Sequence, residues 1–158
     1  MSEVQRHPAE EREKIRSLIL KSARLLDSER FDDYVALYAD NARYAMCARS
    51  PEIGRDMTWF DADRGGLLEL FAELPRHVLD SAERSHLVSV EDVRVNGTGA
   101  SAESNFVVFR TDPRGETQLF AVGRYEDALQ RDGDEWRIKQ RTVRLTTRLF
   151  ATPTPTPL

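Results

Sequence analysis

Cysteine is almost absent from this sequence. Cys47 is the only cysteine among 158 residues, so the chain cannot form an internal disulfide bond. Disulfide bonds persist in oxidising compartments, whereas a single free thiol is ordinary in a reducing one. The cysteine content therefore predicts a protein that works in a reducing compartment.

The scarcity of cysteine and histidine also bears on metal centres. A Rieske iron–sulfur cluster is held by two cysteines and two histidines, and this chain has one cysteine. A mononuclear iron site needs two histidines and a carboxylate in one cavity, but His7, His77 and His86 lie in a terminal segment, a charged loop and a strand start. The sequence has no Gly-rich phosphate loop and no Gly-x-Ser-x-Gly nucleophile elbow. We therefore expect no metal and no cofactor in this chain.

Long apolar runs and an excess of positive charge are also missing. No segment approaches the length that spans a bilayer, and the first twenty residues are charged rather than apolar. The formal net charge is −4 and the isoelectric point is near 5.5, which argues against nucleic acid or an acidic membrane as the main partner. These features predict a soluble, cytoplasmic protein.

One domain is the expected organisation. A chain of 158 residues is long enough to bury an apolar core without covalent staples. We expect this domain over residues 9–150, after a flexible N-terminus at residues 1–8. Threonine and proline alternate within residues 151–158. Because proline has no amide hydrogen, this stretch is predicted to be an extended tail that neither pairs in a sheet nor packs in a core.

Helical spacing of apolar residues is confined to the first half of the chain. Three helices are predicted, over residues 9–28, 31–38 and 63–74. Pro8 suits the start of the first helix. Residues 41–48 are predicted to form a short strand, and residues 49–57 a loop that contains Pro51 and Gly54. The helices are expected to pack on a curved surface.

Strand patterns fill the second half. Strands are predicted over residues 86–95 and 100–111, followed by one long hairpin over residues 117–150. Asn96-Gly97 and Asp132-Gly133 supply residues that tolerate positive φ in tight turns. Helices followed by four long strands predict an α+β fold.

A change of parity in the last strand predicts that the sheet is strongly curved. Trp136 and Ile138 share one face of this strand, whereas Val143 and Leu145 fall on the opposite parity. Because side chains alternate with a period of two, the change requires a β-bulge or sharp bend, which we place near residues 140–142. Bulges of this kind curl a sheet.

His86 is the histidine best placed for chemistry. It begins a strand whose inward face would line the concave side of the sheet, where Asp40 or Asp61 could orient it as a general base. Tyr44 or Tyr125 would be its polar partner. The favoured alternative is a structural histidine, hydrogen-bonded to a carboxylate or to backbone, because no second catalytic group is fixed by spacing.

Basic residues crowd the last strand. They are Arg137, Lys139, Arg141, Arg144 and Arg148. One interpretation is a solvated face that pairs across the sheet with Glu126, Asp127 and neighbouring acids. The other is a protein interface, because arginine is the charged residue that best survives partial burial. Arg137, Arg141, Arg144 and Arg148 are therefore candidate interface residues.

An ordered set of stretches runs through residues 10–150. It includes Phe31-Asp32-Asp33-Tyr34, Arg84-Ser85-His86-Leu87-Val88-Ser89 and Val122-Gly123-Arg124-Tyr125-Glu126-Asp127. The other members are residues 25–27, 35–40, 43–44, 60–64, 104–110, 132–138 and 141–145. This set resembles the small (β) subunit of aromatic-ring-hydroxylating dioxygenases.

The resemblance implies a cone-shaped fold of the nuclear-transport-factor-2 (NTF2) type, in which a strongly curved mixed or antiparallel sheet wraps around about three N-terminal helices. It further implies that this chain holds no cofactor and assembles with a larger α subunit, usually as an α3β3 hexamer. That α subunit would carry the Rieske [2Fe–2S] cluster and the mononuclear Fe(II). The chain would then be a non-catalytic, trimer-forming subunit of an oxidoreductase that oxygenates an aromatic compound.

A different class of function is compatible with the same fold. A free-standing enzyme or binding protein of dehydratase, isomerase or cyclase type would use a cone pocket, with His86 and Asp40 as an acid/base pair and Tyr44 beside them. A deep, polar cavity that reaches His86 would favour this enzyme. A cone interior filled by Trp59, Phe106 or Tyr125 would favour the structural subunit.

Overall fold

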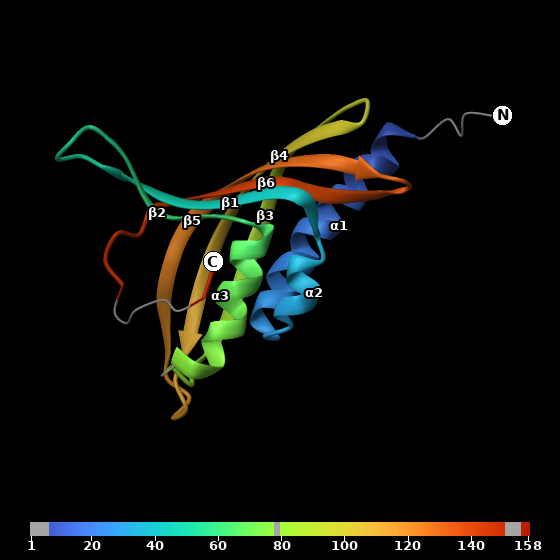
Figure 1. The fold of residues 1–158 in the computed structure, drawn as a ribbon. Coiled ribbons are helices and arrows are strands. Elements are labelled where there is room, and N and C mark those ends of the chain that lie inside the picture. The colour runs from blue at the N-terminus through green and yellow to red at the C-terminus, as the bar shows by residue number, and fades with distance from the viewer. Residues whose placement is uncertain (1–6, 78–79, 151–155) are drawn as a thin grey trace.

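Three helices and six strands make up the part of the chain that the structure describes, which comprises residues 7–77, 80–150 and 156–158 of a computed structural model. In chain order (Figure 1), these elements are α1 (Pro8–Asp27), α2 (Phe31–Val35), β1 (Tyr38–Ser50), β2 (Arg55–Asp63), α3 (Arg64–His77), β3 (Glu83–Asn96), β4 (Gly99–Thr111), β5 (Thr117–Asp132) and β6 (Glu135–Leu145). The predicted α+β class is confirmed. Residues 1–6 of the predicted flexible N-terminus lie outside the described residues.

The strands form one curved sheet in the order β2-β1-β6-β5-β4-β3. Neighbouring strands are antiparallel except β1 and β6, which are parallel. The sheet curls around the three helices, which all lie on its concave side (Figure 1). The predicted cone with a mixed sheet is therefore confirmed.

The first half of the chain differs from the prediction in several bounds. The predicted strand over residues 41–48 extends over Tyr38–Ser50, and the third helix continues to His77, which was predicted to lie in a loop. The second helix ends at Val35, because Tyr38 already pairs with Ile138 as the first residue of β1. Residues 55–57, assigned to a loop, begin β2, which pairs with β1 along its length. This edge strand is exposed over most of its residues, so it lacks the alternation by which a half-buried strand is recognised.

A β-bulge in β6 explains the change of parity. Ala128 pairs with Gln140 and the next residue of β5, Leu129, pairs with Ile138, so Lys139 is the extra residue. The bulge was therefore predicted correctly in kind but lies one residue before the predicted range. It directs Trp136 and Ile138 inward before it, and Arg141, Val143 and Leu145 inward after it. The last strand ends at Leu145, earlier than the predicted Phe150.

The predicted tight turns are confirmed. Gly97 and Gly133 both have φ of 63° and close the β3–β4 and β5–β6 hairpins. Gly123 has a different role, since the Phe106 ring packs directly on its backbone. A Cβ atom at residue 123 would lie 2.7 Å from Cζ of Phe106 and 2.5 Å from the carbonyl oxygen of Arg144. Only glycine lets the ring and the strand approach this closely.

Helix α1 closes the cone by packing on the inner face of β3. Its apolar face, with Ile15 and Ile19 fully buried, joins a single core with the inward residues of the sheet. Among the described residues, no helix is long and apolar enough to cross a membrane. The cytoplasmic location stays a prediction.

Candidate functional site

A fully buried arginine lies inside the cone, between the sheet and α1. Arg141 is fully buried and donates two hydrogen bonds to the Asp127 carboxylate, from Nε at 2.8 Å and from Nη2 at 2.9 Å. Its Nη1 donates to Ser22 Oγ of α1 at 3.0 Å, and its guanidinium lies 4.3 Å from the ring centroid of Tyr125. The prediction that Arg141 is an interface residue is therefore wrong, because the bulge at Lys139 turns it inward.

Four tyrosines surround this ion pair. The hydroxyls of Tyr34 and Tyr38 share a hydrogen bond of 2.7 Å, and the Tyr125 ring stacks on Phe106 with a centroid distance of 4.5 Å. Burial raises the pKa of the hydroxyls of Tyr34, Tyr38, Tyr44 and Tyr125. These groups therefore remain neutral at physiological pH and serve as hydrogen-bonding groups rather than as bases.

The end of the chain also enters the core. Leu158 is fully buried, its amide donates to the Tyr44 hydroxyl at 3.2 Å, and that hydroxyl donates to the Leu158 carbonyl at 3.0 Å. The prediction that the tail does not pack in a core is therefore wrong for its last two residues. Residues 151–155 lie outside the described residues. Proline removes backbone donors from the tail, but it does not prevent a terminal leucine from filling an apolar space.

His86 pairs with a residue that was not predicted. Its Nδ1 lies 2.5 Å from Oδ1 of Asp27, at the end of α1, and its backbone amide donates to Oδ2 of the same carboxylate at 2.8 Å. Asp40 is exposed on β1, and Asp61 instead accepts a hydrogen bond from Arg43 at 2.7 Å. The predicted acid/base pair of His86 with Asp40 is therefore wrong.

The favoured interpretation of His86 as a structural histidine agrees with these contacts. The Asp27 carboxylate joins the last turn of α1 to the start of β3, which fixes the helix on the sheet. The side chain of His86 is nearly fully buried, and its Nε2 has no hydrogen-bond partner among the described residues. Tyr44, the third residue of the predicted site, uses its hydroxyl on Leu158.

A cleft of about 650 Å³ opens beside this pair. Its walls combine apolar side chains of the helices with polar residues near the start of β3, and Asp27 lines it whereas His86 does not. The residues that line it are Leu26, Asp27, Ser28, Glu29, Phe31, Phe71, Leu74, Asp80, Ser81, Ala82, Glu83, Arg84 and Thr156. Phe106 and Tyr125 are buried in the core and do not line this cleft. These two residues are therefore buried as expected of a structural subunit, whereas Trp59, the third residue predicted to fill the interior, is 37% exposed.

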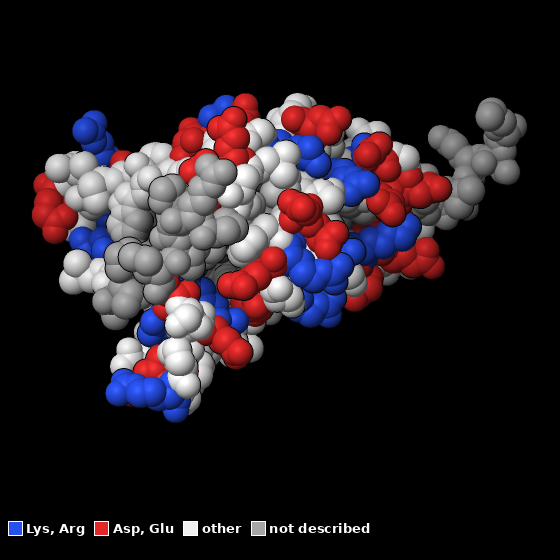
Figure 2. All heavy atoms as spheres, turned by 60° about the horizontal axis from the view of Figure 1, so that its bottom comes forward, with Lys and Arg blue, Asp and Glu red and all other residues white. Residues whose placement is uncertain are grey.

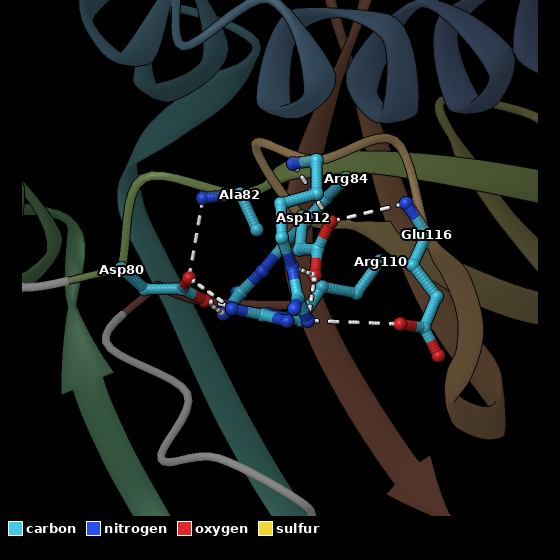
Figure 3. Close-up of polar contacts among 7 residues, drawn as sticks. Asp80, Ala82, Arg84, Arg110, Asp112 and Glu116 are labelled. Carbon is cyan, nitrogen blue, oxygen red and sulfur yellow. Dashed lines mark hydrogen bonds and ion pairs between the residues drawn. The ribbon is translucent and has the colours of Figure 1, made fainter.

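Two arginines and one aspartate hold the polar wall of the cleft together (Figure 3). Asp80 accepts hydrogen bonds from Arg110 Nε at 3.0 Å and Nη2 at 2.6 Å, and these bonds hold the pKa of Asp80 below its usual value. Arg84 lies 3.6 Å from the same carboxylate and donates to Thr156 Oγ1 at 2.6 Å. Burial lowers the pKa of Arg84. The network attaches the chain end to β3.

The other predicted interface arginines lie on the surface. Arg144 donates to Glu126 at 2.6 Å and to Asp56 at 2.7 Å, and these hydrogen bonds raise its pKa. Arg137 donates to the Ala36 carbonyl at 2.7 Å, and Arg148 lies 3.6 Å from Glu52. The predicted pairing with Glu126 across the sheet is confirmed, and the interface role of Arg137, Arg144 and Arg148 stays a prediction.

The described residues show neither a metal-binding cluster nor, on the face in Figure 2, a continuous basic surface. Within the described residues, no group of three His, Cys, Asp or Glu side chains is placed to hold a metal ion. Figure 2 shows acidic and basic side chains interspersed over the visible face, without one continuous basic area on that face.

Comparison with known proteins identifies the family to which this chain belongs. The family model of the SnoaL-like domain matches residues 7–142, so the chain belongs to the SnoaL-like domain family. A structure described as the β subunit of an aromatic-ring-hydroxylating dioxygenase from Novosphingobium aromaticivorans superposes with a TM-score of 0.81 and 27% identity, over 93% of this chain and 96% of that one.

The relatives then indicate the kind of protein within this family. The methanesulfonate monooxygenase hydroxylase subunit beta of Methylosulfonomonas methylovora is 35% identical, over 85% of this chain and 80% of the relative. The 2-aminobenzenesulfonate 2,3-dioxygenase subunit beta of an Alcaligenes species is 26% identical, over 85% and 90%. The predicted resemblance to oxygenase β subunits is confirmed.

Proposed function

We propose that this chain is the non-catalytic structural β subunit of a multicomponent ring-hydroxylating oxygenase. The observation that carries the role of oxygenase β subunit is the 35% identity to a hydroxylase β subunit over 85% of the chain. The superposition on the β subunit of an aromatic-ring-hydroxylating dioxygenase, at 27% identity, supports the ring-hydroxylating class. The packed cone interior, with Phe106 and Tyr125 buried and Arg141 fully paired, supports a rigid scaffold. A scaffold needs no substrate pocket of its own.

In this proposal the chemistry belongs to a larger α subunit. That subunit would hold the Rieske cluster and the mononuclear iron, and three copies of each chain would form the assembly in the cytoplasm. The names of the relatives refer to methanesulfonate, 2-aminobenzenesulfonate and benzene. Since similar β subunits accompany such different substrates, the α subunit's pocket would choose the substrate, for which we propose an aromatic compound.

Purification from the native cell tests the assembly. We expect the tagged chain, isolated gently, to bring a larger iron–sulfur protein in equal stoichiometry, measured by subunit masses and iron content. Recovery of the chain alone and free of iron would contradict the proposal. It would then favour the second candidate, a pocket enzyme that uses His86 and Asp27. The specific observation for this candidate is the buried Nε2 of His86, which has no hydrogen-bond partner in the described part of the chain.

Surface arginines allow a sharper test of the predicted interface. We expect the double variant Arg144→Gln/Arg148→Gln to lower recovery of the α subunit at least tenfold, because both arginines are partly exposed on the outer surface. Arg94→Gln, an exposed arginine on β3, is the matched control. An unaltered complex with the double variant would remove these residues from the interface. Arg141 is unsuitable for this test because its substitution would disturb the core.

A further inference from the structure

The described end of the chain occupies space inside the cone. Residues 156–158 belong to no helix or strand, yet Pro157 and Leu158 are buried, and Leu158 is part of the apolar core. This end lies on the concave side of the sheet (Figure 1). The two buried side chains together contain about as many carbon atoms as a small substituted aromatic ring. The core therefore contains a segment of the size of a small ligand.

One polar side chain holds the backbone of Leu158. The Tyr44 hydroxyl accepts a hydrogen bond from the Leu158 amide at 3.2 Å and donates one to the Leu158 carbonyl oxygen at 3.0 Å. Burial raises the pKa of Tyr44, so this hydroxyl stays protonated and keeps both roles. The ring centroids of Tyr44 and Phe60 lie 5.9 Å apart, edge to face. The position of Leu158 therefore combines apolar surroundings with one group that both donates and accepts.

The cleft of about 650 Å³ approaches this position. Thr156 lines the cleft, whereas Leu158 lies in the core. Arg84 Nη1 donates to Thr156 Oγ1 at 2.6 Å, which fixes the segment at the edge of the cleft. The stacked rings of Phe31 and Phe71, with centroids 4.5 Å apart, form part of the wall. A small molecule that enters the cleft therefore meets the segment that leads to the buried leucine.

A ligand at the position of Leu158 would exchange one buried apolar group for another. Since the free energy of burial follows the apolar area removed from water, a ring of similar size would replace most of what Leu158 contributes. Release of residues 156–158 would return conformational freedom to the backbone, which favours the exchange. The contacts of Thr156 with Arg84 and of Leu158 with Tyr44 oppose it. The segment is therefore a competitor of such a ligand.

We propose that the position of Leu158 is a binding site for a neutral, ring-sized apolar molecule with one hydroxyl group, which residues 156–158 occupy until such a molecule displaces them. A hydroxyl group suits Tyr44, because it both donates and accepts hydrogen bonds. The proposal goes beyond the proposed function, since neither the site nor the segment requires an α subunit. Recovery of the α subunit would not change if the site bound nothing, so the two proposals fail independently.

Hydrogen exchange at the Leu158 amide, followed by NMR in the full chain, tests the displacement. Phenol is the probe. We expect phenol at about 10 mM to speed exchange of this amide about tenfold, because its hydrogen bond to Tyr44 is lost. The matched control is the Ile138 amide, which donates to the Leu37 carbonyl at 2.9 Å in the core and should not change. Equal acceleration at both amides, or none at Leu158, would contradict the proposal.

Two substitutions weaken the competitor without altering the rest of the site. Leu158→Gly empties the side-chain space, so phenol should bind about tenfold more tightly than to the wild type. Thr156→Val removes the hydroxyl that Arg84 binds and should tighten phenol binding about threefold. Thr58→Val, which replaces an exposed threonine on β2, is the matched control and should leave the affinity unchanged.

Circular dichroism verifies that these variants are folded. Phenol affinity that stays at the wild-type value in Leu158→Gly would overturn the proposal. If Leu158→Gly does not fold, the result for Thr156→Val decides in the same way, because this substitution leaves the core intact.

The polar contact has its own test. Tyr44→Phe removes the hydroxyl and also loosens the segment, but the loosening acts equally on every ligand. We therefore expect the ratio of phenol affinity to toluene affinity to fall about threefold relative to the wild type. An unchanged ratio would contradict the proposed site, because Tyr44 would then make no contact with the hydroxyl group of the ligand.

Discussion

At the scale of single residues, the most consequential feature is a charge that the backbone turns inward. Arg141 and Asp127 face each other across β5 and β6, and both side chains are fully buried. A buried ion pair contributes little net stability, but loss of one partner strands the other charge in an apolar interior. Here the pair also joins the sheet to α1 through Ser22.

Removal of one member of this pair should be strongly destabilising. We expect Asp127→Ala to lower the free energy of unfolding by about 3–5 kcal/mol, because Arg141 would remain charged without its carboxylate. The double variant Asp127→Leu/Arg141→Met should lower the free energy of unfolding by less than the single substitution Asp127→Ala. Urea unfolding followed by tryptophan fluorescence measures both.

The matched control lies on the other face of the same strand. Glu126 is partly exposed and binds Arg144, so Glu126→Ala should cost at most about 1 kcal/mol. If Asp127→Ala lowered the free energy of unfolding by less than about 1 kcal/mol, the prediction for the buried Asp127–Arg141 pair would be wrong.

At the scale of elements, Glu11 attaches the first helix to the last hairpin. This buried carboxylate accepts hydrogen bonds from Lys14, Trp136 and Arg131. Burial alone would raise its pKa, but these three donors outweigh burial and lower the pKa from 4.5 to about 2. The attachment therefore depends on the ionised carboxylate.

The sign of the pH dependence follows from this lowered pKa. The contribution of Glu11 to stability is complete above pH 4.5 and is lost as the pH falls from 4.5 towards 2, where the folded protein binds the proton. We expect Glu11→Gln to flatten the fall of unfolding free energy over this range, and to cost about 2 kcal/mol at pH 7. Urea titrations across the pH series measure this effect.

Glu13→Gln replaces an exposed glutamate on the same helix, so this variant is the control for the altered net charge. Parallel pH curves for wild type and Glu11→Gln would refute the assigned role of Glu11.

At the scale of the whole molecule, the curved sheet leaves a space that the end of the chain fills. Leu158 packs in the core among residues that are distant in sequence, and Tyr44 holds its backbone. Arg84 holds Thr156 at the edge of the cleft. The described end of the chain is therefore part of the packed fold.

Truncation of the buried leucine should reveal this packing. We expect Leu158→Ala to lower the free energy of unfolding by about 2–5 kcal/mol, since it opens a cavity in the core. Leu149→Ala, at a leucine that is 91% exposed, should change stability by less than about 0.5 kcal/mol. Equal effects of the two substitutions in chemical denaturation would mean that Leu158 does not pack as described.

Local patterns predicted most elements of the fold, and the failures have identifiable causes. The periodicity around Ile15 and Ile19 identified α1, and the turns at Gly97 and Gly133 placed two hairpins. β2 was missed because an exposed edge strand carries no apolar alternation. Arg141 was placed on the surface, although its parity with Val143 and Leu145 was a signal that it faces inward.

The sequence by itself determined the fold class, the curvature and the family, because these depend on local propensity, on side-chain parity and on an ordered set of segments. Only the tertiary structure decided which distant residues meet: Asp27 rather than Asp40 at His86, and Leu158 at Tyr44. These partners are 59 and 114 residues apart. Contacts over such separations arise from the closure of the sheet around the helices, which no local pattern specifies.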